Sequence, residues 1–160
     1  MKVTVATGSR LHLGFTNLSD DLGRCYGSLG VAIDRPSAVV VVEEGGGTDE
    51  LGDDAERVRA WRRRFCDRFG VDPQVSIAVR QCIPRHAGLG SGTQLALAGG
   101  KGLATVCGLD LRARDIAAAL GRGRRSGIGL AAFATGGFVV DAGHRKGDGG
   151  EEAGPTIVWR

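Results

Sequence analysis

The sequence lacks the features that define several common classes of protein. Its four cysteines, Cys25, Cys66, Cys82 and Cys107, stand far apart and form no C-x-x-C pair, so we expect neither a zinc site nor a disulfide framework. The longest purely aliphatic run covers only residues 38–42, which is far too short to span a bilayer. The N-terminal segment also lacks the apolar core and cleavage site of a secretory signal. These absences predict a cytoplasmic protein with reduced, mostly packed thiols.

A strong excess of charge of one sign is also missing. The net charge is +3, from 21 Lys and Arg against 18 Asp and Glu, and a balance this mild demands no nucleic-acid partner. Arginines crowd residues 57–68, but acidic residues interrupt the run and no aromatic side chains alternate with it. We interpret this run as a solvated helix face, with a nucleic-acid interface as the alternative. The expected partners therefore include neither nucleic acid nor a membrane.

Glycine, in contrast, is abundant, with 28 among 160 residues. Most glycines are scattered through short loops, where they mark turns and sites of close backbone approach. The apolar fraction of 42% and the charged fraction of 24% are ordinary for a globular protein. A chain of this length can form one domain with a real core, so we expect a single domain over residues 1–160.

Hydrophobic patterning predicts strands and helices in segregated layers, which indicates an α+β fold rather than a doubly wound parallel sheet. The alternation of Val75, Ile77 and Val79 predicts a half-buried strand. Helical spacing over residues 54–69 predicts an amphipathic helix that ends at Gly70. The other expected elements are strands over residues 2–7, 29–33, 38–43, 137–142 and 156–159, a loop over residues 8–14, a turn at Arg35-Pro36, and helices over residues 92–106, 110–120 (with Asp110 as N-cap) and 130–134.

The most informative segment is PRHAGLGSGTQ, residues 84–94, a glycine-rich loop that runs into apolar residues 95–106. Ser91 and Gln94 have the spacing of a capping box, which predicts a helix that starts near Gly92. The N–H groups of such a loop and of the first helical turn favour an anion, most simply a phosphate. The pattern is neither a P-loop nor a dinucleotide-binding turn. A tight connection without a ligand is the alternative interpretation.

Histidines and arginines recur in the other glycine-rich segments. Arg10 and His12 stand two residues apart in the early loop, His86 lies in the phosphate loop, and His144 follows a strand. A second loop, GRGRRSGIG over residues 121–129, combines cations with a flexible backbone and suits a polyanionic ligand. Each feature alone is compatible with a structural or solvated role. Together they favour a functional site built from loops.

These segments resemble motifs of the GHMP kinase superfamily. PRHAGLGSGTQ is similar to the phosphate loop P-x-x-x-G-L-G-S-S-A, SRLHLGF (residues 9–15) to the N-terminal signature, and SGIGLAAFATGG (residues 126–137) to the S-G-x-D-x-x-x-x-x-x-G-G segment in length. The resemblance implies a GHMP-kinase-like N-terminal domain of the α+β class, with a mixed or antiparallel sheet packed on helices.

The differences from that superfamily fall on residues of kinase chemistry. Gly129 stands where mevalonate-kinase-like members have a catalytic aspartate, Arg10 stands at the position of the lysine that often pairs with it, and Gly92 replaces the second serine of the phosphate loop. The acid–base apparatus of those kinases is therefore missing.

One branch, the β-ribofuranosylaminobenzene 5'-phosphate synthase family, shares these differences. The chain resembles that family from Ser9 almost to its end. The four motifs that carry the resemblance are SRLHLG, GRCYGSLGVA (residues 23–32), GLGSGTQLALAGGK (residues 88–101) and GRGRRSGIGLAAFATGGFVVDAGH (residues 121–144).

The resemblance implies an early reaction of methanopterin biosynthesis. Phosphoribosyl diphosphate donates its ribose phosphate to the ring carbon of 4-aminobenzoate or 4-hydroxybenzoate, with release of CO2 and diphosphate. Magnesium (Mg2+) is the implied cofactor. Because the departing diphosphate needs charge neutralisation more than a strong base, the absence of an acid at Gly129 is expected.

The residue roles implied by the resemblance are hypotheses. The expected catalytic residues are Arg10, His12 and His144, and Asp141 with Ser91 is expected to bind the metal. Phosphate binding is assigned to Gly88, Leu89, Gly90, Ser91, Gly92, Thr93, Arg24, Arg122, Ser126 and Gly127.

Members of the superfamily are roughly twice as long, so we expect this chain to correspond to the N-terminal portion, without the C-terminal domain that closes the cleft. The face that meets that domain is expected to be apolar and prone to association, and a homodimer is expected. Two alternatives to the synthase remain, namely an ATP-dependent GHMP-type small-molecule kinase and a non-catalytic protein that binds a phosphorylated ligand.

Overall fold

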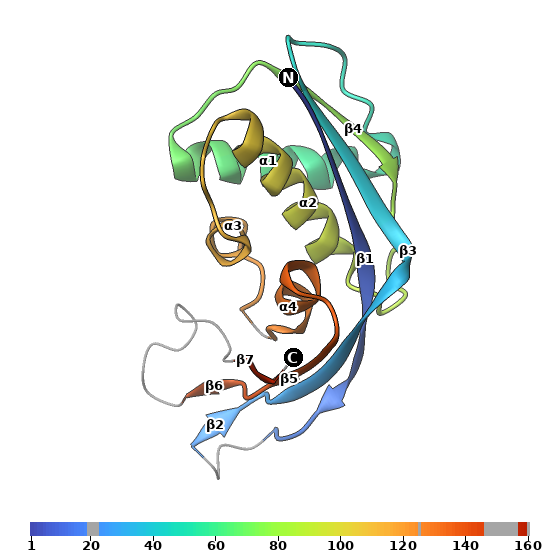
Figure 1. Cartoon of the computed structure of the whole chain (residues 1–160), viewed down its shortest axis with the longest axis vertical. Coiled ribbons are helices and arrows are strands. Elements are labelled where there is room, and N and C mark those ends of the chain that lie inside the picture. The colour runs from blue at the N-terminus through green and yellow to red at the C-terminus, as the bar shows by residue number, and fades with distance from the viewer. Residues whose placement is uncertain (19–22, 125, 146–156, 160) are drawn as a thin grey trace.

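A computed structural model describes residues 1–18, 23–124, 126–145 and 157–159 of the chain. Helices cover one face of a strongly bent sheet, so the fold is α+β as predicted (Figure 1). The sheet is antiparallel, and β3 (Ser28–Glu44) pairs with β1 (Lys2–Phe15) along one edge. Along its other edge, the C-terminal part of β3 pairs with β4 (Val75–Gln81) and its N-terminal part pairs with β5 (Phe138–Asp141). Strand β7 (Ile157–Trp159) extends the sheet beyond β5, and β2 (Arg24–Cys25) pairs separately with β6 (His144–Arg145).

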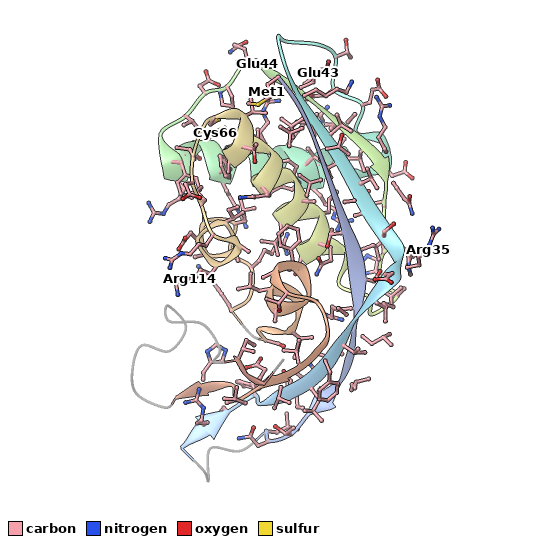
Figure 2. All side chains as sticks on the ribbon, in the orientation of Figure 1. Met1, Arg35, Glu43, Glu44, Cys66 and Arg114 are labelled. Carbon is pink, nitrogen blue, oxygen red and sulfur yellow. The ribbon has the colours of Figure 1, made fainter. Side chains whose placement is uncertain are left out.

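The first two long strands differ from the sequence prediction. Residues 8–14 belong to β1 and are not a loop, and Arg35-Pro36 lies inside β3 and is not a turn between two strands. Register shifts explain how the glycines and the proline are accommodated, because the β1–β3 ladder is interrupted between Thr7 and Ser9 and then resumes. Arg10 and His12 are therefore strand residues, which fixes their side chains on defined faces. Figure 2 shows Arg35 projecting away from the helices where β3 bends.

The helices follow the hydrophobic pattern more closely. A short 3-10 turn, η1 (Gly52–Asp54), leads into α1 (Ala55–Phe69), which ends at Gly70 in the left-handed conformation (φ 63°). Helix α2 (Ser91–Val106) matches its expected span, while α3 (Ala113–Ala119) begins three residues later than predicted. Asp110 is not its N-cap, because Arg112 holds that position and its amide donates to Asp115 at 3.2 Å. The last helix is α4 (Ile128–Ala134).

Helix α2 is the centre of the core. Its buried residues include Leu95, Leu97 and Leu103, and they pack with Val40 and Ile77 of the sheet. Three of its glycines allow this close packing, since a Cβ at Gly99 would lie 2.3 Å from the indole of Trp61. A smaller core forms where Ile128, Ala131 and Val139 join α4 to the bent end of the sheet.

The structure also describes the state of the cysteines and the length of the helices. All four cysteines are free thiols. Burial and a hydrogen bond to Asp54 raise the pKa of the Cys82 thiol to about 11, so that thiol is protonated at neutral pH. Among the described residues, every helix falls short of the length and apolarity needed to cross a bilayer.

Candidate functional site

The N-terminus of α2 forms the centre of the candidate site. Gly90 is the N-cap in the left-handed conformation (φ 77°), and Gly88 has a similar φ of 72°. The amides of Thr93 and Gln94 donate to the Gly90 carbonyl. Those of Ser91 and Gly92 belong to the first turn, where a helix supplies no carbonyl partner. The loop therefore presents donors in the direction that favours an anion.

The predicted capping box is wrong. Helix α2 begins at Ser91 without a side-chain cap, and the Gln94 side chain lies fully buried in the interior. The Thr7 hydroxyl donates to its oxygen at 2.8 Å, and its nitrogen donates to the Gly129 carbonyl at 2.8 Å. Gln94 thus joins β1, α2 and α4 at the point where the two glycine-rich loops meet.

Arg10 lies directly against the phosphate loop. Its amide donates to the Leu89 carbonyl at 3.1 Å, and its guanidinium donates to the Gly88 carbonyl. Its Nε is buried and has no hydrogen-bond partner among the described residues. Burial lowers the pKa of Arg10, yet a guanidinium remains charged at any physiological pH.

Two more guanidinium groups approach the same helix end at Gly92. A Cβ on Gly92 would lie 3.4 Å from Nη2 of Arg57 and 3.8 Å from Nη1 of Arg122. Burial lowers the pKa of Arg122, and the positive charges of Arg57 and Arg64 lower it further. Like charges brought this close are unfavourable unless an anion joins them, so the cluster is arranged for a negatively charged ligand.

Only one carboxylate offsets these charges in the contacts described. Asp54 is buried and accepts from Arg57 at 2.6 Å and from Arg85 at 2.8 Å. Burial alone would raise the pKa of Asp54, but hydrogen bonds from Cys82 and Arg85 and the charge of Arg57 lower it overall. Asp54 therefore holds Arg57 in place while most of the positive charge remains uncompensated.

The sequence analysis missed Arg57 because it interpreted the whole arginine run as solvated. Arg57 and Trp61 stand at i and i+4 on one helical stripe, and Trp61 is buried. That stripe is the signal that separates Arg57 from its exposed neighbours Arg59 and Arg63.

Asp141 lies beneath the second loop, as a buried structural group. Its Oδ2 accepts from the Gly127 amide at 2.7 Å and the Ser28 hydroxyl at 3.2 Å, and its Oδ1 accepts from the Gly143 amide at 2.9 Å. Ser126 completes the cluster through a 3.0 Å contact with the Ser28 hydroxyl. Ser126 and Gly127 therefore shape the start of α4.

These residues do not form a magnesium site made of protein alone. The described residues contain no group of three or more His, Cys, Asp or Glu side chains that could hold a metal ion. Both oxygens of Asp141 already accept hydrogen bonds, and Ser91 contributes a single hydroxyl. Magnesium prefers one or two carboxylates together with substrate phosphates, and the carboxylate oxygens of Asp141 are already occupied by hydrogen bonds. The assignment of Asp141 and Ser91 as metal ligands stays a prediction.

The remaining predicted residues lie toward the bent end of the sheet. His12 is on β1, where burial and then the charge of Arg10 lower its pKa, opposed by Asp141. His144 is on β6, opposite Cys25 of β2, so it lies in a strand and not in a glycine-rich loop. Arg24 donates to the Ala142 and Gly143 carbonyls at 2.8 and 2.7 Å. The structure thus places Arg24 where it joins β2 to the β5–β6 connection.

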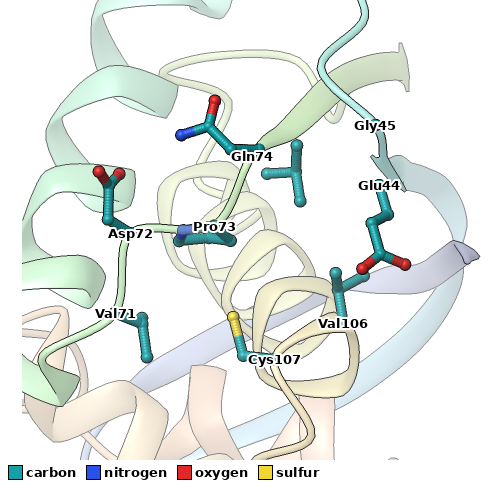
Figure 3. Close-up of a pocket in the computed structure, with 9 residues that line it drawn as sticks. Glu44, Gly45, Val71, Asp72, Pro73, Gln74, Val106 and Cys107 are labelled. Atoms are coloured by element: carbon teal, nitrogen blue, oxygen red, sulfur yellow. The ribbon is translucent and has the colours of Figure 1, made fainter.

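A separate pocket lies at the other end of α2. It has a volume of about 440 Å³ and is lined in part by Glu44, Pro73, Val106 and Cys107 (Figure 3). Helix α2 has 16 residues, so this pocket is roughly 20 Å from the phosphate loop at a rise of about 1.5 Å per residue. The pocket therefore takes no part in the candidate site.

Curated relatives match most of the chain in sequence. The chain is 36% identical over 157 residues to the beta-ribofuranosylphenol 5'-phosphate synthase of Methanothermobacter thermautotrophicus, with 90% of this chain and 47% of the relative covered. It is 34% identical over 159 residues to the enzyme of that name from Methanocaldococcus jannaschii, with 91% and 48% covered. The chain thus spans about half the length of the curated relatives it matches.

Solved structures and a family model agree on the fold. A putative sugar kinase from Campylobacter jejuni aligns with a TM-score of 0.75 at 17% identity over 99% of this chain and 56% of that one. The mevalonate kinase of Methanococcus jannaschii aligns with a TM-score of 0.70 at 13% identity over 100% and 56%. The model of the GHMP kinases N terminal domain matches residues 56–137, just over half of the chain. With its helices packed on one face of an antiparallel sheet and its glycine loop at the start of α2, the chain belongs to the GHMP kinase N-terminal domain family.

Proposed function

We propose that this chain forms the phosphate-binding part of a β-ribofuranosylphenol 5'-phosphate synthase. The reaction would transfer ribose 5-phosphate from phosphoribosyl diphosphate to 4-hydroxybenzoate or 4-aminobenzoate and release CO2 and diphosphate. The observation that carries the proposal is the convergence of Arg10, Arg57 and Arg122 on the first turn of α2. The names of the curated relatives supply the product class.

The chemistry demands stabilisation of the leaving group above all. The ring carbon that bears the carboxylate attacks the anomeric carbon, and the anomeric C–O bond breaks with its electron pair going to diphosphate. Loss of CO2 then returns the electrons of the C–C bond to the ring. Guanidinium groups and main-chain amides suit the departing diphosphate because both bind phosphate oxygens directionally. Preorganised donors of this kind lower the barrier without a strong base.

His12 has the properties of a proton carrier for the ring substituent. Its lowered pKa keeps the imidazole neutral near pH 7, so it can accept the proton of a phenol as the ring attacks and return it after CO2 leaves. Magnesium would be held mainly by the diphosphate oxygens and would add charge neutralisation there.

A small-molecule kinase is the second candidate, supported by the fold alone. The position of the catalytic acid is Gly129, where a Cβ would lie 3.2 Å from Cγ2 of Thr93. The Gly129 carbonyl is already bound by Gln94. Helix α4 is thus packed against α2 where a kinase would need its carboxylate, which favours the synthase over phosphoryl transfer.

The proposal is tested by direct binding of diphosphate to the 160-residue chain, measured by calorimetry. Arg57→Ala and Arg122→Ala should each weaken binding by about 1.5–3 kcal/mol, or roughly ten- to a hundredfold, because each removes a charged hydrogen bond to phosphate. Arg59→Ala removes an exposed arginine from the same helix and should leave the affinity unchanged.

Turnover separates the candidate activities. The chain, supplied with phosphoribosyl diphosphate, 4-hydroxybenzoate and magnesium, would release CO2 and diphosphate if it is sufficient for the synthase reaction. Formation of ADP from ATP with an added alcohol, without CO2, would instead select the kinase. Diphosphate binding without either reaction would select the non-catalytic ligand-binding protein, and equal loss of affinity in Arg59→Ala would contradict the assigned phosphate site.

A further inference from the structure

Three aromatic rings gather at the bent end of the sheet, beside the candidate site. The rings of His12 and Phe15 have centroids 4.8 Å apart and are tilted by 56°. Phe15 and Tyr26 meet edge to face with centroids 6.1 Å apart. We call these three residues the aromatic shelf. Neither Phe15 nor Tyr26 was assigned a role from the sequence, although both stand inside the quoted motifs.

The aromatic shelf lies on the face of the sheet that carries the site. Phe15 pairs with Ser28, whose hydroxyl binds the buried Asp141. His12 pairs with Gly30, where a Cβ would collide with Ile128 of α4. Residues directly opposite each other in an antiparallel pair point to the same face, so both rings face the helix side of the sheet.

Phe15 and Tyr26 are nevertheless partly exposed to solvent. Phe15 is 44% exposed and Tyr26 is 45% exposed, and large aromatic side chains of a folded domain gain stability when they are buried. Helix α4 packs on β1 and β3, yet among the described residues it leaves Phe15 and Tyr26 exposed to this extent. The exposed part of the aromatic shelf is therefore available to another planar group.

The backbone around Tyr26 is built to hold its ring in place. Tyr26 has a φ of 62°, a left-handed conformation that is uncommon for a residue with a side chain. Its amide donates to the Asn17 carbonyl at 3.1 Å, and the Gly27 amide donates to the Asn17 side chain at 2.8 Å. The Thr16 amide closes the turn on the Gly27 carbonyl at 2.6 Å. A conformation this unusual, held by so many bonds, is typical of functional positions.

We infer that the aromatic shelf is the subsite for the ring of the acceptor, a planar benzoate with a hydroxyl or amino group opposite its carboxylate. The inference rests on the proposed function, since the product named for the relatives contains a phenol. The order along β1 fits it, because Arg10 meets the phosphate loop, His12 follows two residues later and Phe15 lies beyond. At about 3.3 Å per strand residue, Arg10 and His12 are roughly 7 Å apart, which leaves space for one ribosyl group.

The experiment is a titration of the 160-residue chain with 4-hydroxybenzoate, followed by NMR. Tyr26 is the only tyrosine, so its ring signals can be assigned without ambiguity. They should shift in a saturable manner. Phe15→Leu keeps an apolar side chain but removes the ring, and it should weaken binding roughly three- to tenfold, which is the value of one aromatic contact. Cyclohexanecarboxylate, which has the charge but no aromatic ring, should bind more weakly than 4-hydroxybenzoate.

Phe138→Leu provides the matched control. Phe138 is similarly exposed, at 42%, but it pairs with Val31, on the face of the sheet away from α4. It should leave the affinity for 4-hydroxybenzoate unchanged. Equal affinity of the wild-type chain and Phe15→Leu, or shifts that spare Tyr26, would overturn the inference.

Diphosphate separates this inference from the proposed function. Phe15→Leu should bind diphosphate like the wild-type chain, which also shows that the variant is folded. Diphosphate binding without saturable 4-hydroxybenzoate binding overturns the aromatic subsite and leaves the phosphate site standing. A wild-type chain that does not bind diphosphate would refute the proposed function itself.

Discussion

Gly92 and His12 show how single residues tune the charge of the site. The missing side chain of Gly92 leaves space for the guanidinium tips of Arg57 and Arg122 beside the first turn of α2. A serine at this position, as in the kinases of the fold, would place its hydroxyl among those tips. His12 stands two residues from Arg10 and therefore responds to whatever neutralises that arginine. Gly92 thus admits the guanidinium tips of Arg57 and Arg122, and the charge of Arg10 helps to keep the His12 imidazole neutral.

His12 should report anion binding through its own titration. Burial and Arg10 lower its pKa, so its NMR titration midpoint should lie below the ordinary value of about 6.5. Diphosphate bound beside Arg10 would offset the positive charge and raise that midpoint. Sodium chloride at equal ionic strength is the control, and an unchanged midpoint with saturating diphosphate would place the anion elsewhere.

The lowered pKa of His12 also makes the stability of the folded chain depend on pH. Because the folded state binds the His12 proton less readily than the unfolded state, the unfolded chain takes up more protons between the lowered pKa and about 6.5. The contribution of His12 to stability is therefore present above about pH 6.5 and decreases as the pH falls through that window. Thermal unfolding of His12→Gln should lose this part of the acid sensitivity.

At the scale of elements, hydrophobic periodicity predicts several helices and strands correctly and fails for others. The helix over residues 54–69 and the strand with Val75, Ile77 and Val79 are confirmed, because local spacing sets their buried faces. The continuity of β1 and β3 was missed, since Gly8 and Pro36 favour a loop locally while long-range pairing carries both strands past them. Helical spacing beside the buried Trp61 could have separated Arg57 from the exposed arginines, but only the packing of α1 on α2 brings it to Gly92.

The predicted capping box and the observed interior contact of Gln94 predict opposite effects on stability for substitutions at Ser91 and Gln94. Gln94→Ala should lower the free energy of unfolding by about 1–3 kcal/mol, because it leaves the buried Gly129 carbonyl without its donor. Ser91→Ala should change it by less than about 0.5 kcal/mol, since Ser91 makes no cap. Chemical denaturation measures both. A larger loss in Ser91→Ala than in Gln94→Ala would show that the capping box is formed after all.

At the scale of the whole molecule, the bent sheet has two unlike faces. Helices cover one face and create the site, while the described helices leave the other face open (Figure 1). On that open face Leu11 of β1 pairs with Val31 of β3, which pairs in turn with Phe138 of β5. Leu11 and Phe138 are 39% and 42% exposed, and Leu13 of the same β1 segment is 56% exposed. Contiguous apolar surface of this kind on three neighbouring strands favours association.

The expected homodimer can be tested on this surface. We expect the chain to associate in a concentration-dependent manner, and Leu13→Lys should shift the equilibrium toward the monomer, because a buried lysine without a partner is costly. Sedimentation equilibrium measures the shift. Leu18→Lys is the matched control, since Leu18 is 71% exposed but lies outside the strands. Because the open face is opposite the phosphate loop, Leu13→Lys should keep its affinity for diphosphate. A monomeric wild-type chain at high concentration, or equal effects of the two variants, would assign the apolar face another role.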